Sequence, residues 1–177
     1  MRETSPSLDV AVSAPVWRNA LEDVEDVCRH AALAALVAGA EGWDEGPPLE
    51  RMEVSLVLSD DAGVRTLNRD YRGQDKATNV LSFAALDDED APVPDDGPVL
   101  LGDVIVAFET VDAEARSEGK TLKDHLSHLV VHGVLHLMGF DHEDDREAAL
   151  MEAMECRVLA GLGIAAPYDD EREAGDE

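Results

Sequence analysis

The stretch HGVLHLMGFDH, at residues 132–142, constrains the fold of this chain more than any other part of its sequence. His132 and His136 are four residues apart, so they lie on successive turns of one helix face. Gly139 then lets the chain leave the helix through a left-handed turn and double back. The pattern predicts a helix that ends at this glycine and a loop that returns His142 to the first two histidines.

Three imidazoles that converge in this way are typical of a zinc site. Two more histidines, His125 and His128, lie on the same stripe of the predicted helix. One ion cannot bind them all, because His128 and His136 are about 12 Å apart along the helix axis at ~1.5 Å per residue. Three protein ligands leave the fourth tetrahedral position for water, as in catalytic zinc sites. We therefore predict one Zn²⁺ per chain, with His132, His136 and His142 as its ligands.

The same ligand spacing, HExxHxxGxxH, occurs in the metzincin zinc proteases. Gly133 stands where the protease has its catalytic glutamate. A metallopeptidase that uses another base is therefore one alternative function, although the glycine argues against it.

Three residues near the predicted ligands are not expected to bind the metal themselves. His128, one turn before His132, is either a partner that orients a ligand or substrate, or an exposed helix residue. Asp141 either orients a histidine or caps the turn. We expect His125 to be an exposed helix residue.

Hydrophobic periodicity along the rest of the chain predicts one α+β domain. Strands cluster early and centrally and helices dominate the end, so we expect a small mixed β-sheet covered by about five helices. The domain is expected to occupy residues 15–165, after a partly strand-forming segment 1–14 and before an acidic, flexible tail 166–177. The predicted strands are residues 52–59, 79–86 and 99–108, and the predicted helices are residues 17–39, 60–70, 109–119, 121–138 and 144–163.

The charge of the chain argues against a general nucleic-acid binder. The sequence has 40 acidic and 14 basic residues, for a formal net charge of -26, whereas non-specific affinity for RNA comes from neutralising phosphates. Many acids fall in two short segments, residues 87–96 and 169–177. Residues 65–76 instead contain four basic and two acidic residues. We expect any anion-binding face to include this segment.

The sequence predicts neither a signal peptide nor a membrane-spanning helix. The first ten residues, MRETSPSLDV, lack the basic and apolar regions of a signal peptide. The most apolar run, residues 31–40, is shorter than the ~20 residues that span a bilayer. Cys28 and Cys156 lie in predicted helices and do not indicate a disulfide framework. We expect a cytoplasmic protein with no membrane partner.

Two further motifs join the histidine stretch: YRGQDKATNVLSF at residues 71–83 and LLGDVIV at residues 100–106. Together the three resemble the YbeY family of bacterial zinc-dependent endoribonucleases that act in ribosomal RNA maturation. The resemblance runs from about residue 50 to about residue 160, with the motifs in the family's order. It implies a single-strand-specific, metal-dependent endoribonuclease that acts in late 16S rRNA 3′-end maturation and in ribosome quality control.

The resemblance also assigns residues. It implies that the three histidines of the first stretch hold the metal and that Arg72 is the family's functional arginine, which stabilises the phosphate. Without the resemblance, a surface salt bridge between Arg72 and Asp70 or Asp75 is the simpler interpretation. The chain departs from the family at Gln74, where a lysine is common, so a positive charge is missing from the presumed phosphate-facing loop.

Other residues in these motifs are expected to be structural. They are Thr78, Asn79, Ser82 and Asp103, with Phe83 in the core. Tyr71 is either a core residue or a stacking platform for bases.

The expected partners are ribosomal RNA and the small ribosomal subunit. Because RNA repels a chain of charge -26 at long range, we also expect help from a ribosomal protein or a GTPase assembly factor. A non-enzymatic, zinc-containing ribosome-associated factor is the remaining alternative.

Overall fold

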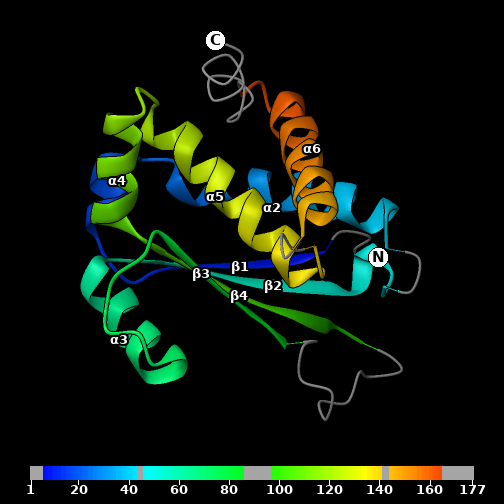
Figure 1. Ribbon diagram of the computed structural model, residues 1–177, viewed down its shortest axis with the longest axis horizontal. Helices are drawn as coiled ribbons and strands as arrows, with labels where there is room; N and C mark the ends of the chain where they lie inside the picture. Colours follow the sequence, from blue (N-terminus) through cyan, green and yellow to red (C-terminus); the bar gives the residue numbers. More distant parts are fainter. Residues whose placement is uncertain (1–5, 44–45, 86–96, 141–143, 165–177) are drawn as a thin grey trace.

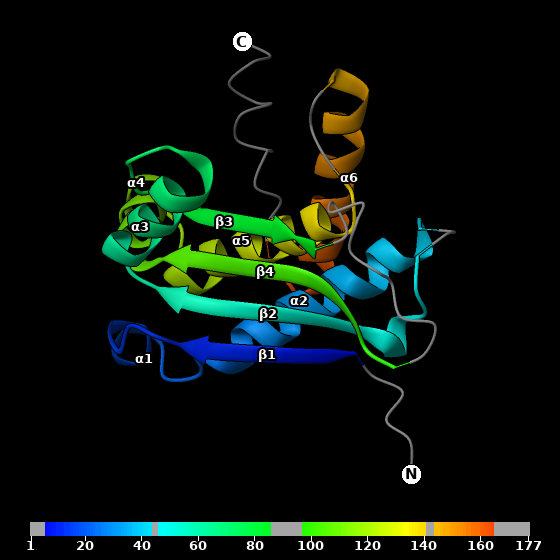
Figure 2. The same cartoon turned by 90° about the horizontal axis from the view of Figure 1, so that it is seen from below.

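The strand predicted from MEVSLVLS is β2, Met52–Ser59, and it lies inside a four-stranded sheet. The computed structural model describes residues 6–43, 46–85, 97–140 and 144–164. β1 (Ser7–Val12) and β4 (Val99–Ala107) are parallel to β2, and β3 (Val80–Ala84) is antiparallel to β4. Figure 2 shows the strands side by side in the order β1-β2-β4-β3. The sheet is therefore mixed, with β3 at the edge.

Helices cover the two faces of this sheet unequally (Figure 1). α2, α5 and α6 lie over one face, whereas α3 lies on the other face against β3 and β4. Within the described residues the helices are α1 (Val16–Ala20), α2 (Val24–Glu41), α3 (Asp61–Arg72), α4 (Phe108–Ser117), α5 (Leu122–Leu137) and α6 (Asp145–Gly161), with a short 3-10 helix at Leu49–Arg51.

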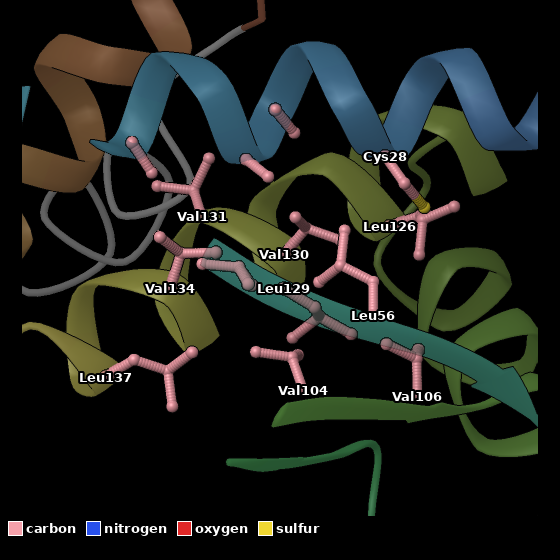
Figure 3. Close-up of a cluster of buried hydrophobic side chains, with 14 of the residues drawn as sticks. Cys28, Leu56, Val104, Val106, Leu126, Leu129, Val130, Val131, Val134 and Leu137 are labelled. Atoms are coloured by element: carbon pink, nitrogen blue, oxygen red, sulfur yellow. The ribbon is translucent and has the colours of Figure 1, made fainter. Parts of the chain in front are cut away.

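The main core lies between the sheet and the layer of α2 and α5. Val130 and Val134 of α5 are fully buried and lie between α2 and the strands that carry Leu56 and Val104 (Figure 3). Full burial of a valine or leucine side chain stabilises the fold by about 1.5–3 kcal/mol. The apolar face of α5 therefore determines its rotation, and with it the direction of the histidine stripe beside that face.

One predicted helix is divided in the structure. The apolar period that begins at Trp17 predicts one continuous helix, but Leu21 is extended and separates α1 from α2. The buried Trp17 indole donates a hydrogen bond to the Ser59 carbonyl at 2.7 Å and packs edge-on against Phe108. These long-range contacts hold α1 at the end of β2, so the local period does not continue across the break.

The predicted α+β class with a small mixed sheet is confirmed. The described residues contain six α-helices rather than about five, because of the division at Leu21. β1 lies within the predicted N-terminal segment, and the acidic segment 87–96 and the tail 166–177 lie entirely outside the described residues. In the described part of the chain, none of the helices is both long and apolar enough to cross a membrane.

Candidate active site

The helix that carries the histidines ends as its sequence predicts. α5 begins at the N-cap Thr121, whose hydroxyl accepts a hydrogen bond from the Asp124 amide at 3.1 Å. At the other end Gly139 has φ +95°, its amide donates to the His136 carbonyl, and the Phe140 amide donates to the Leu135 carbonyl. This pair of bonds is a Schellman motif, which requires the left-handed residue. The predicted turn is confirmed, whereas His142 and Asp141 lie outside the described residues.

His132 and His136 lie together at the C-terminal end of α5. Their ring centroids are 4.7 Å apart, and both rings line a cavity of about 330 Å³. The other lining residues come from β3, including Ser82, and from Arg72 at the end of α3. The fold thus brings together the predicted arginine and two of the predicted ligands, which are 60 residues apart in sequence at their closest, from Arg72 to His132.

Arg72 is held at the cavity by contacts that its neighbours in sequence do not provide. Its Nη2 atom donates to the Ser82 carbonyl at 2.7 Å, and its guanidinium carbon lies 5.1 Å from the centroid of the Phe83 ring. Gly73, with φ +70°, ends α3 directly after the arginine. This position combines a hydrogen bond with a cation–π contact.

The alternative surface salt bridge for Arg72 is wrong. Asp75 instead accepts from Arg65 at 2.7 Å, and Asp70 pairs with Arg69 at 3.2 Å. The hydrogen bond between Arg65 and Asp75 raises the pKa of the arginine and lowers the pKa of the aspartate. Two of the four basic residues of segment 65–76 are therefore paired with acids, and Arg72 is the one that lines the cavity.

Gly133, which stands where the metzincin proteases have a glutamate, lies in tight contact with the sheet. A Cβ atom at this position would lie 2.8 Å from Val104 Cγ1 and 3.2 Å from the Ser82 hydroxyl oxygen. Real Cβ atoms essentially never approach this closely, so α5 sits directly on β3 and β4 at this point. A glutamate at position 133 would not fit this packing, which argues against a metzincin-like peptidase.

Glu155 is a site residue that the sequence analysis missed. It lies on α6 with 1% of its surface exposed, and its Oε1 atom is 2.8 Å from His132 Nδ1 and 3.3 Å from His128 Nε2. Burial by itself raises the pKa of this carboxyl, but the hydrogen bonds from the two histidines outweigh burial and lower the pKa to about 2. A sequence signal existed, because Glu155 shares the buried face of α6 with Met151, Val158 and Leu159. A charged residue at such a position needs a partner.

The two remaining histidines of α5 have different surroundings. His128 reaches Glu155, so it is a partner of a site residue rather than an exposed side chain. The expectation that His125 is exposed is wrong. Its side chain is 5% exposed, and its Nε2 atom is 2.9 Å from Glu114 Oε1 of α4, which also accepts from the Asn79 side chain. α4 packs over this end of α5 and encloses it, which the periodicity of α5 alone does not reveal.

Two aromatic residues lie next to Arg72 but do not line its cavity. Tyr71 is 73% exposed and packs edge-on against Phe83, with ring centroids 5.8 Å apart. Phe83 packs in turn against a small second core under α3, as expected. Ser82, expected to be structural, lines the cavity and also places its hydroxyl 3.5 Å from the Gly133 carbonyl.

The structure describes two of the three predicted metal ligands, His132 and His136. Within the ranges that the structure describes, no three His, Cys, Asp or Glu side chains form a metal-binding group, since the predicted third ligand is outside them. His132 and His136 are nevertheless adjacent, and the carboxylate on His132 Nδ1 leaves Nε2 as the nitrogen that would bind a metal. Two adjacent imidazoles, one of them oriented by a carboxylate, are ligands that zinc accepts.

Comparison with known proteins places this geometry in a family. The sequence model described as Endoribonuclease YbeY matches residues 22–163 of the chain. The chain belongs to the YbeY family. This membership confirms the resemblance inferred from the three sequence motifs.

Relatives named Endoribonuclease YbeY are similar over most of the chain. The relative from Paramagnetospirillum magneticum is 57% identical over 162 residues, which cover 92% of this chain and 95% of the relative. The relative from Rhodospirillum rubrum is 55% identical over 160 residues, covering 88% and 78%. The relative from Azorhizobium caulinodans is 54% identical over 161 residues, covering 91% and 95%. The similarity of this YbeY-family chain to these relatives thus extends over both Arg72 and the histidines of α5.

Proposed function

We propose that this chain is a metal-dependent endoribonuclease that cuts single-stranded RNA. It would act in the cytoplasm on ribosomal RNA, in late 16S rRNA 3′-end maturation and in ribosome quality control. The observation that carries the proposal is the cavity in which Arg72 faces His132 and His136. The names of the relatives, Endoribonuclease YbeY, support the reaction class.

The proposed cofactor is one Zn²⁺ held by His132, His136 and His142. The first two imidazoles are adjacent in the cavity wall, and the Schellman turn at Gly139 directs the chain away from the helix before the third. When bound, the ion would supply Lewis acidity next to the scissile phosphate. The ligand histidines would thus mark the place at which the phosphodiester lies.

Arg72, which lines the same cavity as the two histidines, would bind the phosphoryl oxygens. A guanidinium has five N–H donors, and Nη2 of Arg72 donates one of them to the Ser82 carbonyl. That bond and the Phe83 ring fix the plane of the guanidinium, so it is oriented before substrate arrives. Charge stabilisation by a preorganised donor is worth about 100- to 1,000-fold in rate at comparable sites.

Two neighbouring side chains fit a single strand better than a duplex. The Tyr71 ring is exposed beside the Arg72 wall, where an unpaired base would be able to stack on it. The Ser82 hydroxyl lines the cavity and donates to the Gly133 carbonyl at 3.5 Å, so its oxygen would accept a hydrogen bond from a ribose hydroxyl. Bases within a duplex do not present their faces, so the stacking platform favours unpaired RNA.

The charge of -26 gives the ribosome a role in substrate capture. RNA repels such a chain at long range, and the pairing of Arg65 and Arg69 with aspartates reduces the basic surface further. We therefore include the small ribosomal subunit, with a ribosomal or GTPase assembly partner, in the proposal. Tight binding of the isolated protein to short single-stranded RNA at physiological salt would contradict this part.

The test is cleavage of a labelled single-stranded ribosomal RNA fragment by zinc-loaded protein. Arg72→Ala should lose about 100-fold or more in rate while zinc remains bound. Arg69→Ala is the matched control, because it removes an arginine from the same helix that pairs with Asp70 and does not line the cavity. Its rate should equal that of the unaltered protein.

A third variant, His132→Ala, distinguishes a catalytic metal site from a contaminating nuclease and from a metal site that only stabilises the fold. It should lose cleavage while keeping its fold, as measured by circular dichroism. Equal cleavage by all preparations would point to a contaminating nuclease and contradict the proposal. Loss of the fold on removal of the histidine, with no cleavage by the unaltered protein, would favour the non-enzymatic ribosome-associated factor. Turnover of a peptide library would instead favour the peptidase that Gly133 argues against.

A further inference from the structure

We infer that Glu155 is the positioning residue of the proposed metal site, which it serves by holding His132 in the tautomer that presents Nε2 to the ion. The inference rests on the metal site of the proposed function. It concerns a residue of α6 that lies outside the cavity wall and acts through a ligand.

The contact determines where the proton of His132 lies. Glu155 Oε1 is 2.8 Å from His132 Nδ1, and an ionised carboxylate can only accept hydrogen bonds. Nδ1 must therefore carry the proton, so in the neutral ring the lone pair is on Nε2. A carboxylate that accepts from the second nitrogen of a ligand histidine also fixes the ring plane and makes the ligand more basic.

A second histidine restricts the carboxylate itself. His128 Nε2 lies 3.3 Å from the same Oε1 atom, one helical turn away from His132 along α5. The carboxylate is thus held between two imidazoles of one helix while its own backbone belongs to another. A shift of α6 relative to α5 would move the acceptor and with it the ligand ring.

Stability alone does not explain a carboxylate at this position. Glu155 is 1% exposed and belongs to the buried face of α6, where its neighbours Met151, Val158 and Leu159 belong to the main core. Replacing every member of a buried charged cluster by apolar residues of similar volume is often neutral or stabilising, whereas removing one member alone is destabilising because it leaves its partners buried and unpaired. A positioning role accounts for the retention of charge where packing alone would favour a hydrophobic side chain.

The experiment compares two substitutions at this position with a control on the same helix. Glu155→Met keeps a similar volume and removes the acceptor, whereas Glu155→Gln keeps a neutral acceptor. Glu152→Gln makes the conservative change at a half-buried position nearly one turn earlier. If one Glu155 variant fails to fold, the other still provides the comparison.

The first measurement is the tautomer of His132 in the metal-free protein, from long-range proton–nitrogen NMR spectra at about pH 9, well above the ordinary histidine pKa of ~6.5. The unaltered protein and Glu152→Gln should show His132 protonated at Nδ1. Glu155→Met should show loss of that preference, with Glu155→Gln between them. An unchanged tautomer in Glu155→Met would mean that Glu155 does not hold the proton on His132 Nδ1.

The second measurement is zinc affinity by competition with a chelator. Glu155→Met should bind zinc about 10- to 100-fold more weakly than the unaltered protein, and Glu155→Gln should recover part of the loss. Equal affinity and an unchanged His132 tautomer in the Met variant would overturn this inference alone. A wild-type protein that binds no zinc would overturn the proposed metal site, and this inference with it.

Discussion

The two ends of α5 each carry a histidine that contacts a carboxylate on another helix. At the N-terminal end His125 is 2.9 Å from Glu114 of α4, and at the C-terminal end His132 is 2.8 Å from Glu155 of α6. The side chain of His125 is 5% exposed, whereas that of His132 is 23% exposed and lines the cavity with Arg72. The two histidines therefore have the same kind of partner but differ in exposure. Only His132 is also open to the cavity.

The surroundings of the two ends explain why one is closed. α4 packs over the N-terminal half of α5, and Cys28 of α2 lies beside Leu126 there (Figure 3). At the C-terminal half, Gly133 brings α5 down onto the sheet next to Ser82, and His132 and His136 line the cavity together with residues of the edge strand β3. The close approach of α5 to the sheet at Gly133 thus lies directly beside the cavity that His132 and His136 line.

The largest expected effect is on metal affinity. His136→Ala should weaken zinc binding by more than the ~10- to 100-fold expected for loss of a partner that only orients a ligand, because it removes a ligand. His125→Ala, at the closed end, should leave zinc affinity unchanged, as should His30→Ala at an exposed position of α2. Competition with a chelator measures all three. Equal loss in His125→Ala would break the distinction between the two ends.

The next effect concerns the close approach at Gly133. Gly133→Ala should lower the free energy of unfolding by about 1–3 kcal/mol, because the added Cβ would overlap Val104. Gly161→Ala is the matched control, since a Cβ atom there would meet nothing within 4 Å. It should be neutral or stabilise by up to ~1 kcal/mol. Denaturant unfolding curves measure both, and equal stability of the two variants would contradict the tight contact.

A somewhat smaller effect is expected from the closed histidine. His125→Gln should lower the free energy of unfolding by about 1–2 kcal/mol, because the side chain exchanges a hydrogen bond to Glu114 for a poorer one in a buried position. RNA cleavage by the folded variant should be unchanged. A loss of cleavage without a loss of stability would mean that the closed end takes part in the chemistry.

The smallest effect near neutral pH is on Cys28. Burial raises the pKa of the Cys28 thiol to about 12 from its ordinary 9.0, so the folded protein should resist alkylation there while the half-buried Cys156 reacts first. Mass spectrometry after iodoacetamide treatment at about pH 8 checks this order.

The same thiol predicts how stability depends on pH. Above pH 9.0 the unfolded chain loses the Cys28 proton while the folded chain keeps it up to about pH 12. The stability that Cys28 contributes is therefore fully present below pH 9.0 and is lost as pH rises toward 12. Unfolding curves at increasing pH should show a smaller decline in Cys28→Ala. An identical decline would contradict the raised pKa.

Most of the helices and strands, and the residue types of the candidate site, could be predicted from local sequence patterns. The strand at residues 52–59, the left-handed turn at Gly139 and the histidine spacing on α5 all follow from local rules, because period, capping and glycine conformation depend on residues close in the chain. The three motifs also sufficed to indicate the family.

Which side chains contact one another, and which are enclosed, depends on the packing of the helices and strands. Arg72 lies over Phe83 rather than in a salt bridge, His125 is enclosed by α4, and Glu155 reaches His132 from a different helix. Each depends on how separate elements dock, and docking follows from the burial of apolar faces over the whole domain. Local sequence carries a residue's chemistry, whereas its partner and its access to solvent come from segments 11 to 23 residues away or more.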